Sequence, residues 1–354
     1  MPIPLIPIAI AAGSAIAGAV GIGKGIKAAS DNSKAGDINK NAQSRVDNAK
    51  RYLELTRDAT KDALEHLGKK KLEIYDGDMK RFVDFYGLLK NVKIKESPEL
   101  NELKKFKIDK QSLAEIRQDC ELAGEVIGGV ASGALAGGLM AFGAYGAATT
   151  FAAASTGTAI ATLSGAAATN ATLAFFGGGA LAAGGLGVAG GMAVLGGIVA
   201  GPALAIAGFV MGNKAEENLN NAYSNLAKAK EIAEELNVLS AASEAIAKRT
   251  RLFSVQLDKL RKLFRPQIDA MVGIVNDEGT DYSRFSPSSQ SCIAAVVATA
   301  QAIKAILDTP ILDKSGALTA ESEAILSGTK KFLSGTPKTA RRPAKNRDPS
   351  KGLD

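Results

Sequence analysis

The stretches VIGGVASGALAGGLMAFGAYGAA (residues 126–148) and GGMAVLGGIVAGPALAIAGFVMG (residues 190–212) decide the interpretation of this chain. Both lie in a segment from Val126 to Asn213 that contains no Asp, Glu, Lys, Arg or His, although the sequence on either side is rich in charge. A helix needs about 20 apolar residues to cross the hydrocarbon core of a bilayer. We therefore predict a membrane-active apolar helical hairpin with these two stretches as its arms. The alternative is a buried Gly/Ala-rich core in a soluble protein, because periodicity alone does not separate a buried helix from a spanning one.

Rows of glycine run through the predicted hairpin at a spacing of four residues. In lipid, helices associate by close approach of their backbones, and small residues four apart permit that approach. This spacing predicts that the arms pack through glycine faces as a glycine zipper. The residues of these faces are Gly129, Gly133, Gly137, Gly187, Gly191, Gly197, Gly201, Gly208 and Gly212.

The N-terminal residues Met1–Gly23 are also free of charge. They contain a further row of small residues, Gly13, Ala17, Gly21 and Gly25, and the first lysines, Lys24 and Lys27, follow the apolar part. A secretory signal carries its positive charge before the apolar core, so we expect no cleavage. The lysines should stay in the cytoplasm, with the N-terminus crossing the membrane or lying on its surface. The alternative is a helix docked on the protein's own hairpin.

Amphipathic helices with apolar residues three and four apart flank the hairpin on both sides, which is coiled-coil spacing. The expected seams are Val46, Ala49, Leu53, Thr56, Thr60, Ala63 and Leu67 before the hairpin, and Leu219, Ala222, Leu226, Ala229, Ala233 and Leu236 after it. Second apolar faces are Tyr75, Met79, Phe82, Tyr86 and Leu89, and Phe253, Leu257, Leu260 and Phe264. We expect the two long helices to pair because both emerge from the same side of the hairpin. A break is expected near Gly68, and Pro266 should bend or end the later helix.

The predicted fold is all-α, because Ala, Gly, Leu, Lys and Glu dominate and aromatic residues make up only 5% of the chain. Two further helices are expected near 291–307 and 319–333, and Lys304 and Asp308 argue against a membrane span in the first of them. The chain divides into six segments: an apolar N-terminal segment (1–28), an amphipathic coiled-coil region (29–120), the hairpin (121–213), a return coiled-coil helix (214–265), a C-terminal helical region (266–335) and a disordered basic tail (336–354).

Residue types argue against enzymatic function. His66 is the only histidine, which excludes multi-histidine metal sites and histidine-based catalysis. No glycine loop is followed by the Lys-Ser or Lys-Thr pair of a phosphate-binding loop. Cys120 and Cys292 are expected to be reduced thiols in a cytoplasmic setting. We therefore expect no catalytic residues, no cofactor and no metal.

The net charge of +7 is spread among interleaved acidic and basic residues, except in the basic tail. That tail could touch anionic lipid or nucleic acid, but nothing in it predicts a specific nucleic-acid partner.

Three motifs carry a resemblance to known proteins: LSGAAATNATL at 163–173, VLGGIVAGPAL at 194–204 and KLEIYD at 71–76, the last followed by RFV at 81–83 and KNV at 90–92. They resemble a widespread family of poorly characterised bacterial proteins over most of residues 1–265. The resemblance implies a bacterial origin but brings no activity or site residues. In architecture the chain is similar to helical pore-forming toxins and apolipoprotein-L-like proteins, which is an analogy of fold alone.

The expected function is a membrane-inserting helical protein, such as a pore-forming or membrane-perturbing bacterial effector that acts through the glycine-packed hairpin as a homo-oligomer. Its lipid partner would be the bacterial inner membrane, and the charged helices would lie in the cytoplasm. The protein could also be soluble before it inserts. The first alternative is a constitutive membrane scaffold whose coiled coil docks protein partners. The second is a soluble helical protein with a Gly/Ala-rich core.

Overall fold

The computed structural model describes residues 26–94, 108–130, 139, 142–144, 219–313 and 316–335. These residues form the helices α1 (Ile26–Glu73), α2 (Lys80–Tyr86), α3 (Lys110–Val130), α9 (Leu219–Glu278), α10 (Pro287–Asp308) and α11 (Ala320–Gly335), with a π-helical turn η1 (Ile74–Met79) and a 3-10 turn η5 (Tyr282–Arg284). Within these ranges the only β pairing consists of two isolated bridges. The predicted all-α class is confirmed.

Two compact units make up the structure, and α1 and α9 contribute to both. Unit 1 comprises residues 1–46 and 211–231, and unit 2 comprises residues 47–210 and 232–354. In unit 1, the Asn225 side-chain amide donates a hydrogen bond to Asn39 Oδ1 at 3.3 Å. Four alanines of this unit are buried: Ala35, Ala42, Ala222 and Ala229. The small side chains permit close packing of the two helices in this unit.

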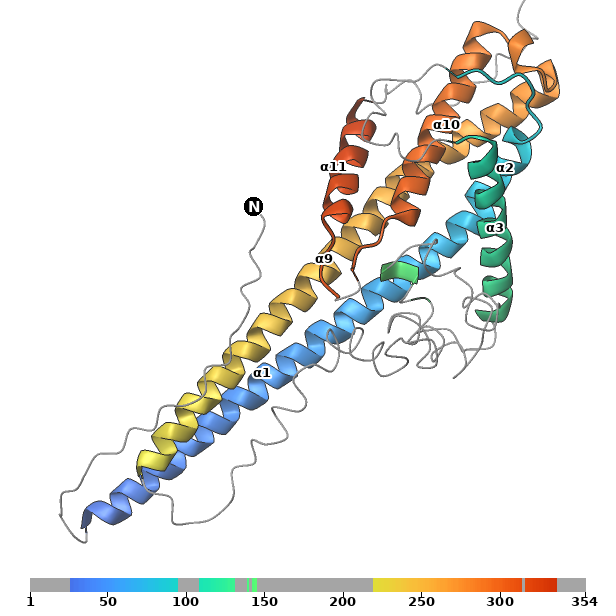
Figure 1. The fold of residues 1–354 in the computed structure, drawn as a ribbon. Coiled ribbons are helices and arrows are strands. Elements are labelled where there is room, and N and C mark those ends of the chain that lie inside the picture. The colour runs from blue at the N-terminus through green and yellow to red at the C-terminus, as the bar shows by residue number, and fades with distance from the viewer. Residues whose placement is uncertain are drawn as a thin grey trace, which may run out of the picture. The chain divides into compact units, whose positions relative to one another are not determined.

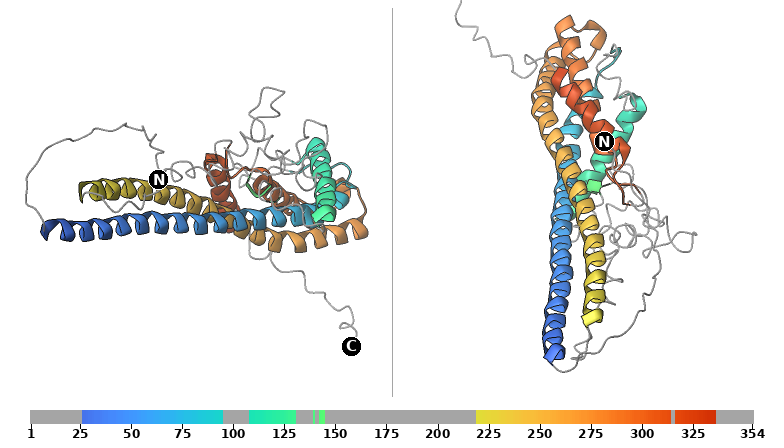
Figure 2. Two further views of the ribbon diagram at one scale, coloured as in Figure 1. Left: turned by 90° about the horizontal axis from the view of Figure 1, so that it is seen from below. Right: turned by 90° about the vertical axis from the view of Figure 1, so that its left-hand side faces the viewer.

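In unit 2, α1 and α9 pack side by side and run in the same direction (Figures 1 and 2). The α9 partners of Tyr52, Lys70 and Arg81 are Glu244, Asp258 and Asp269, so residue numbers rise together along both helices. The predicted pairing of the long helices is therefore confirmed. The two helices are parallel, a direction about which the residue spacing makes no prediction.

The seams predicted from the sequence coincide with the packed faces. Leu53 is buried and Leu226 is half-buried, and the other residues of both seams are buried or half-buried. The aromatic face is also confirmed as a packing surface: the Phe82 ring lies 5.2 Å from the Tyr86 ring and 5.7 Å from the Phe264 ring, between centroids. Periodicity alone thus located the buried faces of the long helices.

The break predicted near Gly68 is wrong, and Pro266 does not end the later helix. Helix α1 continues through Gly68 and gives way only at the π-helical turn η1, and α9 continues through Pro266 to Glu278. Proline removes one backbone hydrogen bond of a helix. Burial of the neighbours Phe264 and Ile268, which are 0% and 1% exposed, offsets this loss through tertiary packing.

The C-terminal helices complete the core of unit 2. Helix α10 begins at a cap in which Ser286 accepts a hydrogen bond from the Ser289 backbone, and α11 packs against it. By length and composition α10 is the one candidate membrane span among the described helices, but most of it is buried inside the protein. Lys304 and Asp308, the two charges that argue against a span in the sequence, form an ion pair at 2.6 Å.

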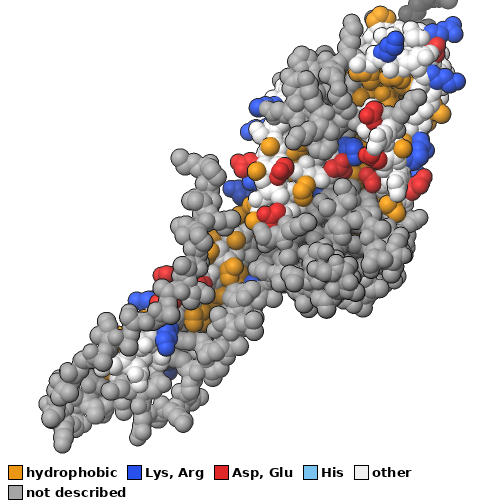
Figure 3. All heavy atoms as spheres, viewed as in Figure 1, with side chains coloured by type: hydrophobic (Ala, Val, Ile, Leu, Met, Phe, Trp, Pro, Cys, Tyr) orange, Lys and Arg blue, Asp and Glu red, His pale blue; other side chains and the backbone are white. Residues whose placement is uncertain are grey.

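Charges of both signs are interspersed on the visible face of the described residues (Figure 3). This agrees with the interleaved sequence pattern.

Candidate functional site

Part of the predicted first hairpin arm is docked on α1 in unit 2. Phe142 and Ala144 are each 1% exposed, and the backbone of this segment touches α1 at two glycines. A Cβ atom added to Gly68 would lie 1.9 Å from the Leu139 carbonyl oxygen, and one added to Gly143 would lie 2.1 Å from that of Leu64. Since real Cβ atoms never approach so closely, both positions require glycine. We call residues 139 and 142–144 the docked segment.

Polar contacts hold the docked segment as well. The Lys71 amine donates to the carbonyl oxygens of Phe142 and Gly143, each at 3.4 Å, and lies 5.7 Å from the centre of the Phe142 ring. From the loop after α10, the Ile311 backbone N–H donates to the Ala144 carbonyl at 2.7 Å. Helix α1 and the loop after α10 thus satisfy backbone groups of this segment, as burial requires.

Ionisable side chains from three helices surround Lys71. The Tyr75 hydroxyl donates to Asp308 at 2.9 Å, and Lys304 donates to the other Asp308 oxygen at 2.6 Å. The Asp119 carboxyl group of α3 belongs to the same cluster, because the charges of Lys304 and Asp308 both shift its pKa. We call Lys71, Tyr75, Asp119, Lys304 and Asp308 the docking network.

Burial shifts the protonation equilibria of the docking network. It lowers the pKa of Lys71 to about 7, an effect that the Asp308 charge opposes. Burial also raises the pKa of Asp119 to about 7, opposed by Lys304 and reinforced by Asp308. The neighbouring Cys120 thiol is free, and burial raises its pKa to about 12, so it is a poor nucleophile. Lys71, which contacts the docked segment, and Asp119 of α3 therefore change charge near neutral pH.

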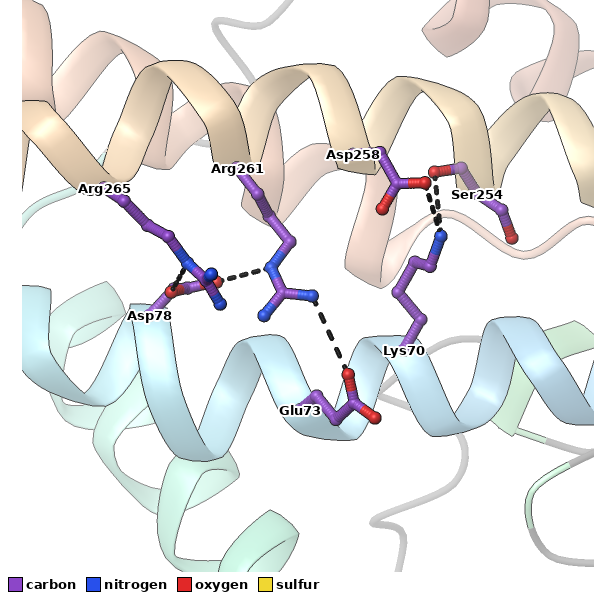
Figure 4. Close-up of polar contacts among 7 residues, drawn as sticks. All are labelled: Lys70, Glu73, Asp78, Ser254, Asp258, Arg261 and Arg265. Atoms are coloured by element: carbon purple, nitrogen blue, oxygen red, sulfur yellow. Dashed lines mark hydrogen bonds and ion pairs between the residues drawn. The ribbon is translucent and has the colours of Figure 1, made fainter.

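A set of ion pairs fixes the π-helical turn that follows the docking network (Figure 4). Asp78 is 7% exposed and accepts hydrogen bonds from Arg261 at 2.6 Å and from Arg265 at 2.7 Å. Arg261 also lies 3.7 Å from Glu73. One turn earlier, Lys70 binds Asp258 at 2.6 Å and the Ser254 carbonyl at 3.4 Å. These contacts orient Lys71 and Tyr75, because the residues on both sides of them are tied to α9.

Most residues of the predicted glycine faces lie outside the described residues. Gly129 falls within α3, near its C-terminal end. The others outside the description are Gly133, Gly137, Gly187, Gly191, Gly197, Gly201, Gly208 and Gly212, together with Gly13, Ala17, Gly21 and Gly25 of the N-terminal segment. Packing through these faces stays a prediction.

Sequence reasoning missed the docking network. Lys71 follows Lys69 and Lys70, and nothing local distinguishes the buried lysine from its exposed neighbour. A usable signal was Gly68, because a glycine inside a helical pattern marks either a break or a close backbone approach. The sequence pattern predicts a break at this glycine, whereas the structure has a close backbone approach there.

The arrangement can hold a peptide segment and change its charge near neutral pH. His66 is exposed, and no group of three His, Cys, Asp or Glu side chains among the described residues could hold a metal ion. The resemblance to a bacterial family stays an expectation from the sequence. No protein-family model, curated protein or solved structure matches this chain.

Proposed function

We propose that this chain is a conditionally membrane-inserting helical protein, whose helical body holds part of the apolar segment in water and releases it into a bilayer. After release, the glycine faces associate and perturb the membrane. The docked segment carries this proposal, because a short piece of an uncharged sequence is held by glycine contacts and by a lysine whose pKa lies near 7. Release of the described part of this segment withdraws Leu139, Phe142 and Ala144 from the core of unit 2.

The pairing of α1 with α9 supports a body that can rearrange. We infer a parallel coiled coil in unit 2, since the buried residues on both helices step by three and four. Its seam holds many small hydroxyl residues where coiled coils usually carry Leu and Ile: Thr56, Thr60, Ser240, Ser243, Thr250 and Ser254. Less apolar area is therefore buried per turn than in a Leu/Ile seam, and the pair is held less tightly here.

Leakage of a dye from liposomes tests the proposal. Gly68→Leu places a side chain where the Leu139 backbone lies, so it should displace the docked segment and increase leakage by about tenfold at pH 7. The matched control is Gly36→Leu, at a glycine of the same helix with open space around it, which should leak like the parent. If both variants leak like the parent while Gly68→Leu keeps its helical circular dichroism, release of the docked segment does not control insertion.

Association with the membrane is measured separately by fractionation. A charge at the centre of a spanning helix costs roughly 2.5 to 3.5 kcal/mol on insertion scales. Gly133→Arg and Gly197→Arg should therefore shift the protein to the soluble fraction. Equal membrane binding by the parent and by both variants would contradict insertion of the apolar segment.

A second candidate rests on the burial of Phe142 and Ala144 in the core of unit 2. In this alternative the apolar segment is a permanent core of a soluble helical protein, and the parent neither binds liposomes nor resists carbonate extraction from membranes. A parent that resists extraction without causing leakage would instead support a constitutive membrane scaffold with a partner-docking coiled coil.

A further inference from the structure

Helix α9 carries a second stripe of coiled-coil spacing, on the side that does not pack against α1. Its members follow one another in alternating steps of four and three residues, all within unit 2. They are Glu234, Val238, Ala241, Ala245, Lys248, Leu252, Val255 and Lys259. Ala245 is half-buried and the other members are exposed. We call these residues the outer stripe.

The outer stripe leaves large apolar side chains in water. Val238, Leu252 and Val255 are 59%, 43% and 46% exposed. Single exposed apolar residues are common on protein surfaces, but a row of them on one helix face favours contact with a partner. Ala241 and Ala245 lie between them in the stripe, and such small side chains permit close approach of another helix.

The order of residue types along the outer stripe is complementary to its own reverse. A two-fold axis between Ala245 and Lys248 would place a second copy of the stripe against the first in antiparallel orientation. The facing residues are then Glu234 with Lys259, Val238 with Val255, Ala241 with Leu252, and Ala245 with Lys248. Each pair joins one a position with one d position of the heptad, so side chains of one helix enter the spaces of the other.

Charge selects the antiparallel orientation. Glu234 and Lys259 are exposed, and the structure gives neither an ion-pair partner among the described residues. In a parallel pair in register, each of these charges would face its own copy and be repelled. In the antiparallel pair, Glu234 of each copy faces Lys259 of the other, and both ends of the interface carry opposite charges. The partner that fits this surface is therefore a second copy of the chain.

We propose that two copies of this chain associate in water through the outer stripe, as an antiparallel dimer with two-fold symmetry. The same surface of each copy forms the interface, as in most homodimers. Lys248 lays its aliphatic stem over Ala245 of the other copy and keeps its amine in water. The proposal does not depend on insertion of the apolar segment, because the whole stripe belongs to α9 and no lipid takes part.

The expected affinity is modest. A single pair of helices forms a small interface, so we expect a dissociation constant on the order of micromolar. At nanomolar concentration the chain is then a monomer, and measurements of its unfolding refer to that state.

Sedimentation equilibrium of the full chain without lipid tests the dimer. Glu234→Lys and Lys259→Glu each place like charges at both ends of the interface and should weaken dimerisation at least tenfold. The double variant Glu234→Lys/Lys259→Glu exchanges the two charges and should dimerise like the parent. The control is Lys228→Glu, at an exposed lysine of α9 outside the stripe, which should also dimerise like the parent.

Two results would overturn the proposal. One is a parent that is still a monomer at about 100 μM, far above the expected dissociation constant. The other is a double variant that dimerises as weakly as the single variants, because a merely structural role of these charges would not be restored by their exchange.

Cysteine cross-linking tests the orientation. In the antiparallel dimer Val238 faces Val255, whereas the two copies of either valine are about 25 Å apart along the helix axis, too far for a disulfide. Mild oxidation should therefore link Val238→Cys to Val255→Cys in a mixture, and neither variant to itself. The parent controls for the native Cys120 and Cys292. Linkage of each variant to itself would contradict the antiparallel dimer. Both experiments are done without lipid, so failure here is distinguishable from failure of conditional insertion.

Discussion

Along unit 2, α1 is held to α9 in two different ways. Around Thr56 and Thr60 the contacts are small hydroxyl side chains, one of which, Thr60, donates to the Ser243 carbonyl at 2.8 Å. From Tyr75 to Tyr86 the contacts are buried aromatic rings, closed by Asp78 and two arginines (Figure 4). Residues 64–71, which hold the docked segment, lie between these two regions in the sequence. The Phe142 ring of that segment also lies 6.3 Å from the Tyr75 ring, between centroids, so release of the segment uncovers one end of the aromatic region.

The largest loss of stability is expected in the aromatic region. Phe264→Ala removes a ring that is 0% exposed and that lies 5.7 Å from Phe82, so it should lower the free energy of unfolding by about 3 to 5 kcal/mol. Leu252→Ala, at a residue that is 43% exposed, should change it by less than about 0.5 kcal/mol. Urea denaturation followed by circular dichroism measures both. A cost below 1 kcal/mol for Phe264→Ala would show that the two regions do not differ.

The ion pairs of the π-helical turn should rank second. Asp78→Ala leaves Arg261, whose side chain is 17% exposed, with the longer 3.7 Å contact to Glu73 in place of its 2.6 Å hydrogen bond, and should cost about 2 to 3 kcal/mol. The comparison is Asp269→Ala, which breaks the exposed pair with Arg81 and should cost less than about 1 kcal/mol. The urea midpoints of the two variants measure both losses of stability. Equal losses would show that the buried ion pairs of Asp78 stabilise the protein no more than the exposed pair of Asp269.

The docking network should give stability a minimum near pH 7. The pKa of Lys71 is lowered from 10.5 to about 7, so the unfolded chain binds more protons between these values and stability falls as the pH falls through this range. The pKa of Asp119 is raised from 3.8 to about 7, so the folded protein binds more protons between these values and stability rises as the pH falls from 7. Each slope is at most about 1.4 kcal/mol per pH unit.

Two substitutions separate the halves of this pH profile. The urea midpoint of each variant is measured at pH 5, 7 and 9. The midpoint of Lys71→Met should no longer rise from pH 7 to 9, and that of Asp119→Asn should no longer rise from pH 7 to 5. Lys69→Met, at the exposed neighbour of the buried lysine, should retain both. A parent without a minimum between pH 5 and 9 would refute the role assigned to these two groups.

The smallest effect is expected in the hydroxyl-lined region. Thr60→Val keeps the shape of the side chain and removes a hydroxyl whose single proton is shared between two carbonyls, those of Thr56 at 2.7 Å and Ser243 at 2.8 Å. Both carbonyls belong to helices and keep their backbone donors, so we expect stabilisation of about 0.5 to 1 kcal/mol. The control is Ser240→Ala, because the Ser240 hydroxyl donates to the Leu236 carbonyl of the same helix. Destabilisation of Thr60→Val by more than 1 kcal/mol would show that its hydroxyl holds the helices together.

Residue spacing predicted the helices and their buried faces well. Val46, Leu53 and Leu67 are buried where the three-four pattern placed them, as are Tyr75 and Phe82. A helix turns about 100° per residue, so spacing alone determines which side chains share a face. The same reasoning could not reveal the direction of α9, because a seam looks alike in parallel and antiparallel pairs.

The sequence by itself determined the all-α class, the buried faces of the long helices and the limits of the uncharged segment, because composition and periodicity are local properties. Only the tertiary structure decided that Gly68 is a contact with the docked segment and that Lys71 is the buried lysine of three. Both depend on residues far apart in the chain. Burial and the proximity of other charges, which set pKa values and binding, arise only when those residues are brought together by folding.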